Sequence, residues 1–395
     1  MREIRVLFDF GASGRHHSLY DEILEAPPAG VHYTVPSLSS RRIPHFAVKA
    51  YQKVRGALDG KIDLAHLARR VNRAAITREV KYDVVHMGNH LDPVPSPFVV
   101  DFEQALSFMH GKVDEKNLAA EVAKLRAERT RAMESEQCKF LLPWTNEGAK
   151  SVWKAFPSKK IKEKTRVVSL AMQLPQEHKP IAHEGFKVLF LGTSNLGGEW
   201  NFYYRGGRRL LRVFEMFAKG RKDAELVMTG EIPPLERAYA EKIGRCRITG
   251  LMSREELGRT IRSADVLLFP SYGTPGLAFL EAKRHHLPII TTDAWANREI
   301  VDDGKDGLIV PFVKFRTRVD FGFPLFKHQF IALEKHDADV ELEKGLVRAL
   351  EKMRASSPKQ RRKMGDAGFH KVAEGKFSIS ARNKKLRQIY AECVE

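Results

Sequence analysis

A turn rich in proline and glycine, residues 270–276, is the first place where this sequence could do chemistry. It follows an apolar run, Asp265–Phe269, and leads into an amphipathic segment that opens at Gly276 and carries Glu281. A helix that begins here would direct its free backbone N–H groups and the positive end of its dipole at an anion such as phosphate. Glu281 could accept hydrogen bonds from ribose hydroxyls. The alternative is an ordinary strand–turn–helix connection of an α/β domain.

The segments around this turn form an ordered series of strand-like runs, glycines and charged residues between about 187 and 312. In this order they resemble the nucleotide-sugar-binding half of retaining glycosyltransferases of the GT-B fold, family 4 (glycosyl transferases group 1). The likeness lies in the ordered set and in no single segment. The segments that carry it are Val188–Gly192, Arg205–Gly206, Ala224–Gly230, Ile248–Gly250, Ala264–Val266, Pro270–Ser271, Pro288–Thr291 and Glu299–Val301, with Gly304 and Gly307.

The resemblance implies a nucleotide sugar, linked to UDP or GDP, as the donor. Arg205 would offer a fixed cation to the departing diphosphate, which gains negative charge as the glycosidic bond breaks. The alternative for Arg205 is a surface position in a basic cluster with Arg208 and Arg209. The donor-binding set implied by the resemblance is Gly11, Gly14, Thr193, Arg205, Gly273, Thr274, Gly276, Leu277, Glu281 and Glu299.

Two positions depart from the family pattern. The family usually carries two glutamates eight positions apart, and counting back from Glu281 gives Gly273. The missing carboxylate would normally contact hydroxyls of the transferred sugar, so those hydroxyls are left to water, backbone or another side chain. Thr193 stands where many relatives have arginine. The nucleotide half of the site is therefore expected to be intact and the sugar half to be changed.

On the acceptor side, the segment 98–103 resembles the strand whose end usually bears a histidine near the reacting sugar. Here Glu103 takes that place, and Asp101 points to the same side if the segment stays extended. Either could bind or polarise the acceptor hydroxyl, or serve as a helix-cap partner. The catalytic set is thus Arg205, Glu103 and Asp101, and the resemblance to retaining members of the family implies that no side chain acts as a covalent nucleophile. No Asp-x-Asp motif occurs within the segments that carry the resemblance, so no obligatory metal is expected.

The chain alternates strand-like and helix-like segments, which favours parallel sheets covered by helices. Thr145 is expected to cap the helix that contains Val152. The resemblance implies two Rossmann-like domains facing each other across a cleft: an acceptor-side domain (1–175), a linker (176–186), a nucleotide-sugar-binding domain (187–376) and a final helix (377–395) that returns to the first domain. Strands in the first half are expected at 4–10, 31–35, 82–86, 98–102, 139–142 and 166–170.

Composition bears on the possible partners of the protein and on its localisation. The 395-residue chain has a net charge of +18, and residues 41–81 hold eleven Lys/Arg against three acidic residues. This basic segment suits a solvated helix on its own domain, a peripheral contact with an anionic membrane, or nucleic acid, which is disfavoured because no nucleic-acid motif accompanies it. Three widely spaced cysteines and the absence of a leader or long apolar run favour the cytoplasm.

These observations predict a metal-independent retaining glycosyltransferase, hexosyl or pentosyl, with a glycan, a lipid-linked molecule or another hydroxyl compound as acceptor. The alternative, motivated by Gly273, is a GT-B scaffold that binds nucleotide or glycan without efficient turnover. Fold alone would not separate the two.

Overall fold

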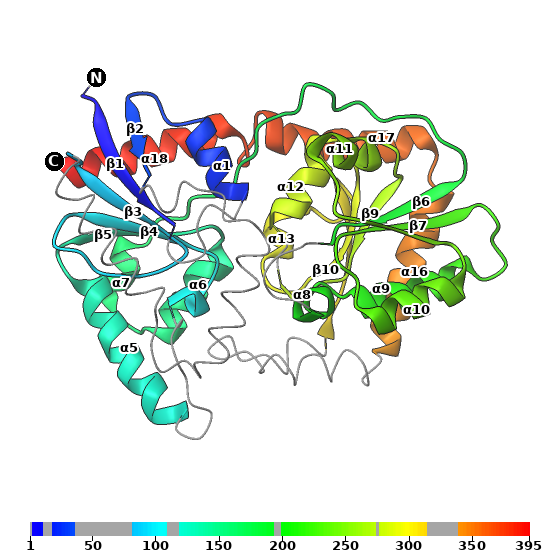
Figure 1. Ribbon diagram of the computed structural model, residues 1–395, viewed down its shortest axis with the longest axis horizontal. Coiled ribbons are helices and arrows are strands. Elements are labelled where there is room, and N and C mark those ends of the chain that lie inside the picture. Colours follow the sequence, from blue (N-terminus) through cyan, green and yellow to red (C-terminus); the bar gives the residue numbers. More distant parts are fainter. Residues whose placement is uncertain are drawn as a thin grey trace. The chain divides into compact units, whose positions relative to one another are not determined.

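The computed structural model describes residues 2–10, 18–35, 81–108, 118–192, 199–273, 276–313 and 339–395, the side chains of 118–122 excepted. The chain divides into two compact units (Figure 1). Unit 1 comprises Met1–Ala171 and Ile379–Glu395, and unit 2 comprises Met172–Ser378. Of the basic segment 41–81, with its predicted membrane contact, residues 41–80 lie outside the described residues.

Unit 1 is built on a five-stranded parallel sheet in the order β2-β1-β3-β4-β5. Its strands are β1 (Ile4–Asp9), β2 (Val31–Thr34), β3 (Val84–Gly88), β4 (Phe98–Phe102) and β5 (Cys138–Pro143). Its helices are α1 (Ser18–Glu25), the 3-10 turn η2 (Ala105–Phe108), α5 (Leu118–Glu134), α6 (Asn146–Ala155), α7 (Lys159–Lys164) and α18 (Ile379–Val394).

The two faces of this sheet bury separate cores, as the alternation of side chains along strands requires. Leu7 and Val85 pack on one face with residues of α6 and α7, such as Val152. Val6 and Val84, opposite each other in register, pack on the other face with Leu386 of α18. The last helix of the chain therefore completes the core of unit 1, beside its first strand (Figure 1).

Unit 2 is built on a six-stranded parallel sheet in the order β11-β10-β9-β6-β7-β8. Helices α9, α10 and α16 cover one face, and α11, α12 and α17 cover the other (Figure 1). The strands are β6 (Phe186–Phe190), β7 (Ala224–Thr229), β8 (Cys246–Gly250), β9 (Val266–Phe269), β10 (Ile289–Thr292) and β11 (Gly307–Val310). The helices are α8 (Glu199–Tyr204), α9 (Gly207–Ala218), α10 (Pro234–Ile243), α11 (Arg254–Arg262), α12 (Gly276–Arg284), α13 (Asn297–Ile300), α16 (Val340–Ala355) and α17 (Pro358–Ala373).

The predicted α/β architecture with two parallel sheets is confirmed. The predicted cap is confirmed too, since Thr145 accepts a hydrogen bond from the Gly148 backbone N–H at 3.0 Å. The strand expected at 166–170 is wrong. Beyond an isolated bridge at Thr165, the Arg166 and Val168 backbones donate to β5 without forming a ladder. Its apolar residues instead line the hollow beside α18.

In both sheets the order in which the chain adds strands reverses at one internal strand. In unit 2 the chain builds β6, β7 and β8 to one side and then starts again at β9, on the other side of β6. In unit 1 the corresponding reversal lies between β1 and β3. Open parallel sheets bind ligands outside the carboxyl ends of the strands at such reversals. The residues after β6 and β9, and those after β1 and β3, are therefore the places to examine.

Candidate functional site

The predicted Pro/Gly turn follows β9, at the reversal point of the unit 2 sheet. Here the junction between α8 and α9 approaches the turn closely. Gly206 has a left-handed φ of 76°, and a Cβ there would lie 2.7 Å from the Pro270 carbonyl carbon. Only glycine suits both conditions without strain. The Tyr272 backbone N–H also donates to the Tyr204 carbonyl at 3.0 Å. Residues from two distant parts of the sequence therefore meet at this sheet edge.

Arg205 lies at this junction and is half-buried. Its guanidinium carbon is 5.6 Å from the ring centroid of Phe269, the last residue of β9. Its backbone N–H donates to the Asn201 carbonyl at 3.1 Å, which continues the α8 turn. The side chain is thus held on an aromatic face at the carboxyl end of the sheet, where a cation can meet an anionic ligand.

Arg209 is the feature of this site that the sequence analysis missed. It was grouped with surface arginines, but it is 1% exposed. Its guanidinium donates to the Pro270 carbonyl at 3.3 Å and to the Tyr272 hydroxyl at 2.7 Å, and it stacks on Tyr272 and Phe312 at 4.7 Å each. Arg209 therefore stabilises the turn through its buried contacts with Pro270 and Tyr272. The available signal was its place on the apolar face of α9, beside Leu210.

Arg208 does not form a free surface cluster either. It pairs with the fully buried Glu236 carboxylate at 2.8 Å and stacks 4.3 Å from the Tyr239 ring. Arg208 and Arg209 therefore both have structural partners within unit 2. Arg205 is the one placed over the end of β9.

Helix α12 begins at Gly276, which is buried, followed by the half-buried Leu277. Glu281 lies in the same helix with its side chain 13% exposed. Its Oε1 accepts hydrogen bonds from Arg284 Nε at 3.0 Å and Nη2 at 2.6 Å, and His285 Nε2 lies 3.6 Å away. Every contact that the structure describes at this carboxylate goes to Oε1.

The electrostatics keep this carboxylate charged. Burial alone would raise the pKa of Glu281, but His285 and Arg284 outweigh burial, and the net pKa lies below its ordinary value. An ionised carboxylate accepts stronger hydrogen bonds than a neutral one. Glu281 is thus suited to accept from hydroxyls at neutral pH.

Glu299 lies in the short helix α13 and is half-buried. Its backbone carbonyl accepts a hydrogen bond from the Lys376 ammonium. The remaining predicted donor-side residues, Gly11, Gly14, Thr193 and Thr274, lie outside the described residues.

In unit 1, Asp101 lies inside a buried polar network. Its Oδ1 accepts from the Tyr20 hydroxyl at 3.1 Å and from the Asn89 backbone N–H at 3.0 Å, and its Oδ2 is 3.2 Å from His86 Nε2. The network continues to α18, because His86 Nδ1 is 2.6 Å from the Tyr390 hydroxyl. Burial, reinforced by Asp101, holds the pKa of Tyr20 well above its ordinary value, so the phenol remains a donor.

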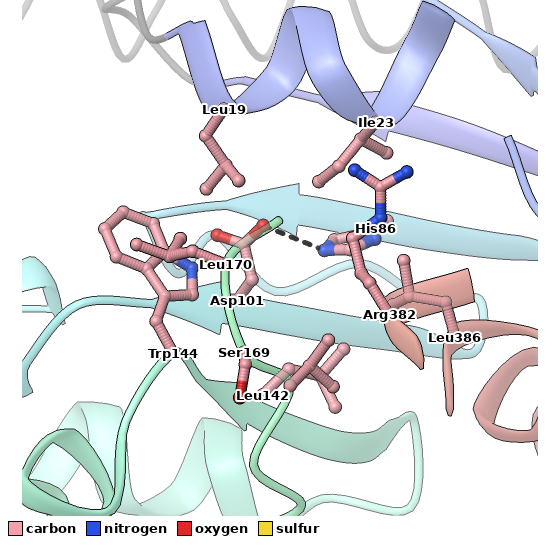
Figure 2. Close-up of a pocket in the computed structure, with 11 residues that line it drawn as sticks. Leu19, Ile23, His86, Asp101, Leu142, Trp144, Ser169, Leu170, Arg382 and Leu386 are labelled. Carbon is pink, nitrogen blue, oxygen red and sulfur yellow. Dashed lines mark hydrogen bonds and ion pairs between the residues drawn. The ribbon is translucent and has the colours of Figure 1, made fainter. Parts of the chain in front are cut away.

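A hollow of about 20 Å³ lies beside this network, with Asp101 and His86 on one side and Arg382 on another (Figure 2). Its other walls are mainly apolar and include Trp144 and Leu170. This volume is sufficient for an ordered water. The surroundings of Asp101 thus favour an internal structural role for this carboxylate.

Of the two predicted acceptor-side carboxylates, Glu103 lies directly beyond Asp101 and Phe102, and its charge adds to that of Asp101 in raising the pKa of Tyr20. Strand β4 ends at Phe102, and Glu103 follows it, half-buried, with its backbone N–H donating to Asn89 Oδ1 at 3.3 Å. A second histidine lies near the unit 1 reversal: His90 is buried, with Nδ1 3.0 Å from the Gly88 carbonyl and Nε2 3.6 Å from Asp9. Sequence reasoning missed His90. The signal was its position just beyond the strand that ends at Gly88.

Two further properties concern the part of the chain that the structure describes. It contains no group of three or more His, Cys, Asp or Glu side chains arranged to hold a metal ion. None of its helices has both the length and the apolarity to cross a membrane.

Cys138, Cys246 and Cys393 are free thiols, and burial raises the pKa of each to about 12.

Comparison with known proteins finds a family match for one part of the chain. Residues 186–314 match the family model described as glycosyl transferases group 1. Over 136 residues the chain is 29% identical to the alpha-D-kanosaminyltransferase of Streptomyces kanamyceticus. That match spans 33% of this chain and only 33% of the relative.

Solved structures match along the whole chain. Sucrose-phosphate synthase from Thermosynechococcus elongatus has a TM-score of 0.62 at 15% identity, with 99% of each chain covered. A glycosyltransferase from Rickettsia africae ESF-5 has a TM-score of 0.62 at 12% identity, with 100% of both chains covered. Anabaena HepE in complex with UDP and glucose has a TM-score of 0.60 at 11% identity, covering 99% of this chain and 100% of that one.

At these identities the structural matches establish the fold, which is the predicted GT-B fold. The family match covers the segment that contains Arg205, the turn after β9 and helix α12. Within this GT-B chain, residues 186–314 are therefore the part that matches the glycosyl transferases group 1 family.

Proposed function

We propose that this protein transfers a sugar from a nucleoside diphosphate sugar to a hydroxyl acceptor, with retention of the anomeric configuration. One observation carries the proposal. At the reversal point of the unit 2 sheet, the structure gathers a cation, a close-packed turn and a helix start that leads to an ionised carboxylate. The family match of 186–314 covers this same segment, and the Anabaena relative of the same fold binds UDP and glucose.

In the proposed complex, the diphosphate lies at the start of α12, where backbone N–H groups and the helix dipole favour an anion. The ribose of a UDP- or GDP-linked sugar donates its hydroxyls to Glu281. Arg205 stabilises the charge that develops on the diphosphate as the bond between the anomeric carbon and the phosphate oxygen breaks. The acceptor oxygen forms the new bond, and its proton passes to the departing diphosphate. Thr193, Gly11, Gly14, Thr274 and Glu299 remain proposed contributors to donor binding.

On the acceptor side we propose Glu103 as the group that binds the acceptor hydroxyl, and Asp101 as a residue that positions the strand ends around it. The buried contacts of Asp101 with Tyr20, His86 and the Asn89 backbone support this division. We further propose a glycan or lipid-linked acceptor, action in the cytoplasm and no requirement for a divalent metal, because Arg205 and the helix start supply the positive charge. The membrane contact through 41–81 stays a prediction from the sequence.

The decisive test is a panel of UDP- and GDP-linked sugars assayed for binding and for donor consumption, with and without EDTA. A donor at a hundredfold its Kd adds about 2.7 kcal/mol to the stability, which a thermal shift detects. We expect nucleotide release from at least one donor, undiminished by EDTA, and NMR of the product should show the donor's anomeric configuration. Binding without donor consumption across the panel would favour the scaffold alternative, and no nucleotide binding at all would refute both.

Glu281→Ala is expected to weaken binding of the nucleoside diphosphate by about 1.5–3 kcal/mol, or about 10- to 150-fold in Kd. The physical reason is the loss of a charged acceptor for the ribose hydroxyls. Isothermal titration with UDP or GDP measures the change. Inorganic pyrophosphate, which has no ribose, should bind the variant as it binds the wild type.

The matched control is Glu255→Ala, which removes a carboxylate that is 81% exposed on α11 and should leave both affinities unchanged. Since Glu281 also pairs with Arg284, the apo melting temperature of each variant is recorded first, and titrations are run well below it. Equal nucleotide affinity in Glu281→Ala and wild type would exclude the ribose contact.

A further inference from the structure

Two aromatic residues of α8 form a pair, and one of them contacts the turn that leads into α12. Trp200 and Tyr204 are one helical turn apart, with ring centroids 4.9 Å apart and an interplanar angle of 30°. Both are half-buried, so each keeps some surface toward solvent. Tyr204 immediately precedes Arg205, the cation assigned to the diphosphate, and its own backbone carbonyl holds the Tyr272 N–H. The pair therefore belongs to the same junction as the proposed donor site.

The ring of Tyr204 occupies the space that a side chain at position 273 would need. A Cβ on Gly273 would lie 2.7 Å from Tyr204 Cε1 and would overlap the phenol oxygen. Gly273 does not adopt a left-handed backbone conformation, so the constraint at this position is the space taken by Tyr204 and not φ. The turn is fixed in this arrangement, because Ser271 Oγ donates to the Gly273 carbonyl at 2.5 Å and Arg209 holds Pro270 and Tyr272. A side chain at 273 would therefore displace the phenol of Tyr204 from this position.

The phenol of Tyr204 lies where the sugar of a bound nucleoside diphosphate sugar is expected. The sugar of a nucleoside diphosphate sugar is bonded directly to the terminal phosphate, so a diphosphate at the start of α12 places the sugar beside the turn 270–273. Tyr204 is the side chain that fills this turn. A phenol both donates and accepts hydrogen bonds, whereas a carboxylate only accepts. Its ring, continued by Trp200, adds an apolar face suited to the C–H surface of a sugar.

We propose that Tyr204, backed by Trp200, recognises the transferred sugar, with its hydroxyl hydrogen-bonded to a sugar hydroxyl or amine at the edge next to Gly273. The inference rests on the proposed function and names the residue that determines its sugar specificity. Gly273 is then the partner substitution that makes room for Tyr204. A sugar that lacks a polar group at this edge gains less from the phenol.

The first test compares sugar and nucleotide binding in Tyr204→Phe, which keeps the ring and removes the hydroxyl. We expect KM for the preferred nucleotide sugar to rise by about 3- to 10-fold, as for the loss of one neutral hydrogen bond, while Kd for the free nucleoside diphosphate is unchanged. Tyr239→Phe is the control, because it removes a phenol hydroxyl that donates to Glu215 elsewhere in unit 2. Equal effects of Tyr204→Phe on the nucleotide sugar and the free nucleotide, or no effect on either, would overturn the assignment.

The second test is a double-mutant cycle that combines substitutions at Tyr204 and Gly273. Gly273→Glu alone should lose donor turnover because the new side chain collides with Tyr204, and Tyr204→Ala alone should lose it by removing the sugar contact. The double variant Tyr204→Ala/Gly273→Glu should recover at least about 3-fold over either single variant, with a changed ranking of donor sugars across the panel. A double variant no better than the worse single variant, with all three folded by thermal melt, would overturn the proposal.

The outcomes separate this inference from the proposed function. If wild type neither binds nor consumes any nucleotide sugar, the proposed function fails. If wild type is active and the Tyr204 variants alter sugar and nucleotide binding alike, the function stands and the sugar assignment fails.

Discussion

Replacing Asp306 by alanine is expected to lower the free energy of unfolding by about 3–5 kcal/mol, the loss typical when one partner of a buried ion pair is removed. Asp306 and Lys283 have fully buried side chains, and Lys283 Nζ lies 2.6 Å from Asp306 Oδ2. Lys371 of α17 reaches the same oxygen at 2.5 Å, and Oδ1 accepts the Asp302 backbone N–H at 2.8 Å. Removing this carboxylate leaves Lys283 on α12 buried without its counter-ion, and burial, which lowers the pKa of Lys283 to about 8 even beside Asp306, then favours the neutral, unpaired amine.

Urea denaturation monitored by circular dichroism measures the loss, with Asp302→Ala as the matched control. Asp302 contacts Lys371 at 2.9 Å but its side chain is 45% exposed, so its removal should cost less than about 1 kcal/mol. Lys283→Met combined with Asp306→Leu should recover most of the stability, because no buried charge is then left unpaired and Lys371 keeps Asp302. Equal losses for Asp306→Ala and Asp302→Ala would contradict the argument.

The sequence predicted those parts of the fold whose pattern is local. The strand that ends at Phe269, the turn after it and the helix opening at Gly276 stand where the apolar run, the Pro/Gly cluster and the amphipathic segment placed them. The cap at Thr145 was readable for the same reason, since its partner Gly148 is three residues away. The strand expected at 166–170 was wrong because an apolar stretch can equally line a hollow beside a helix.

The rest of the candidate site depends on contacts between residues far apart in the sequence. Arg209 reads as one more surface charge, and only its contacts with Pro270 and Tyr272 show that it supports the turn. The replacement of a family glutamate by Gly273 was visible, but the ring that fills the space comes from Tyr204, on another helix. Asp101 reads as a strand-end carboxylate that faces a ligand. Its network runs through His86 to Tyr390, 304 residues from His86.

Arg205→Ala is expected to reduce the turnover number by about 10²- to 10³-fold, the usual cost of removing one group that stabilises charge developing in the transition state. The diphosphate gains negative charge only as the glycosidic bond breaks, so the donor's Kd should change far less than kcat. The placement supports this role: the guanidinium lies over Phe269 at the carboxyl end of β9, at the reversal point of the sheet. Initial rates at saturating donor measure kcat, and titration with a non-transferable analogue of the nucleoside diphosphate sugar measures donor binding.

Two variants sharpen the interpretation of this prediction. Arg205→Lys keeps the charge but not the planar donor geometry, so it should restore part of the rate. Arg237→Ala removes an exposed cation of α10 in the same unit and should leave the rate unchanged, which separates a local effect from a loss of general positive charge. If Arg205→Ala weakens donor binding while the saturating rate stays at the wild-type value, Arg205 only binds the diphosphate. The barrier would then have to be lowered by the backbone N–H groups at the start of α12 alone.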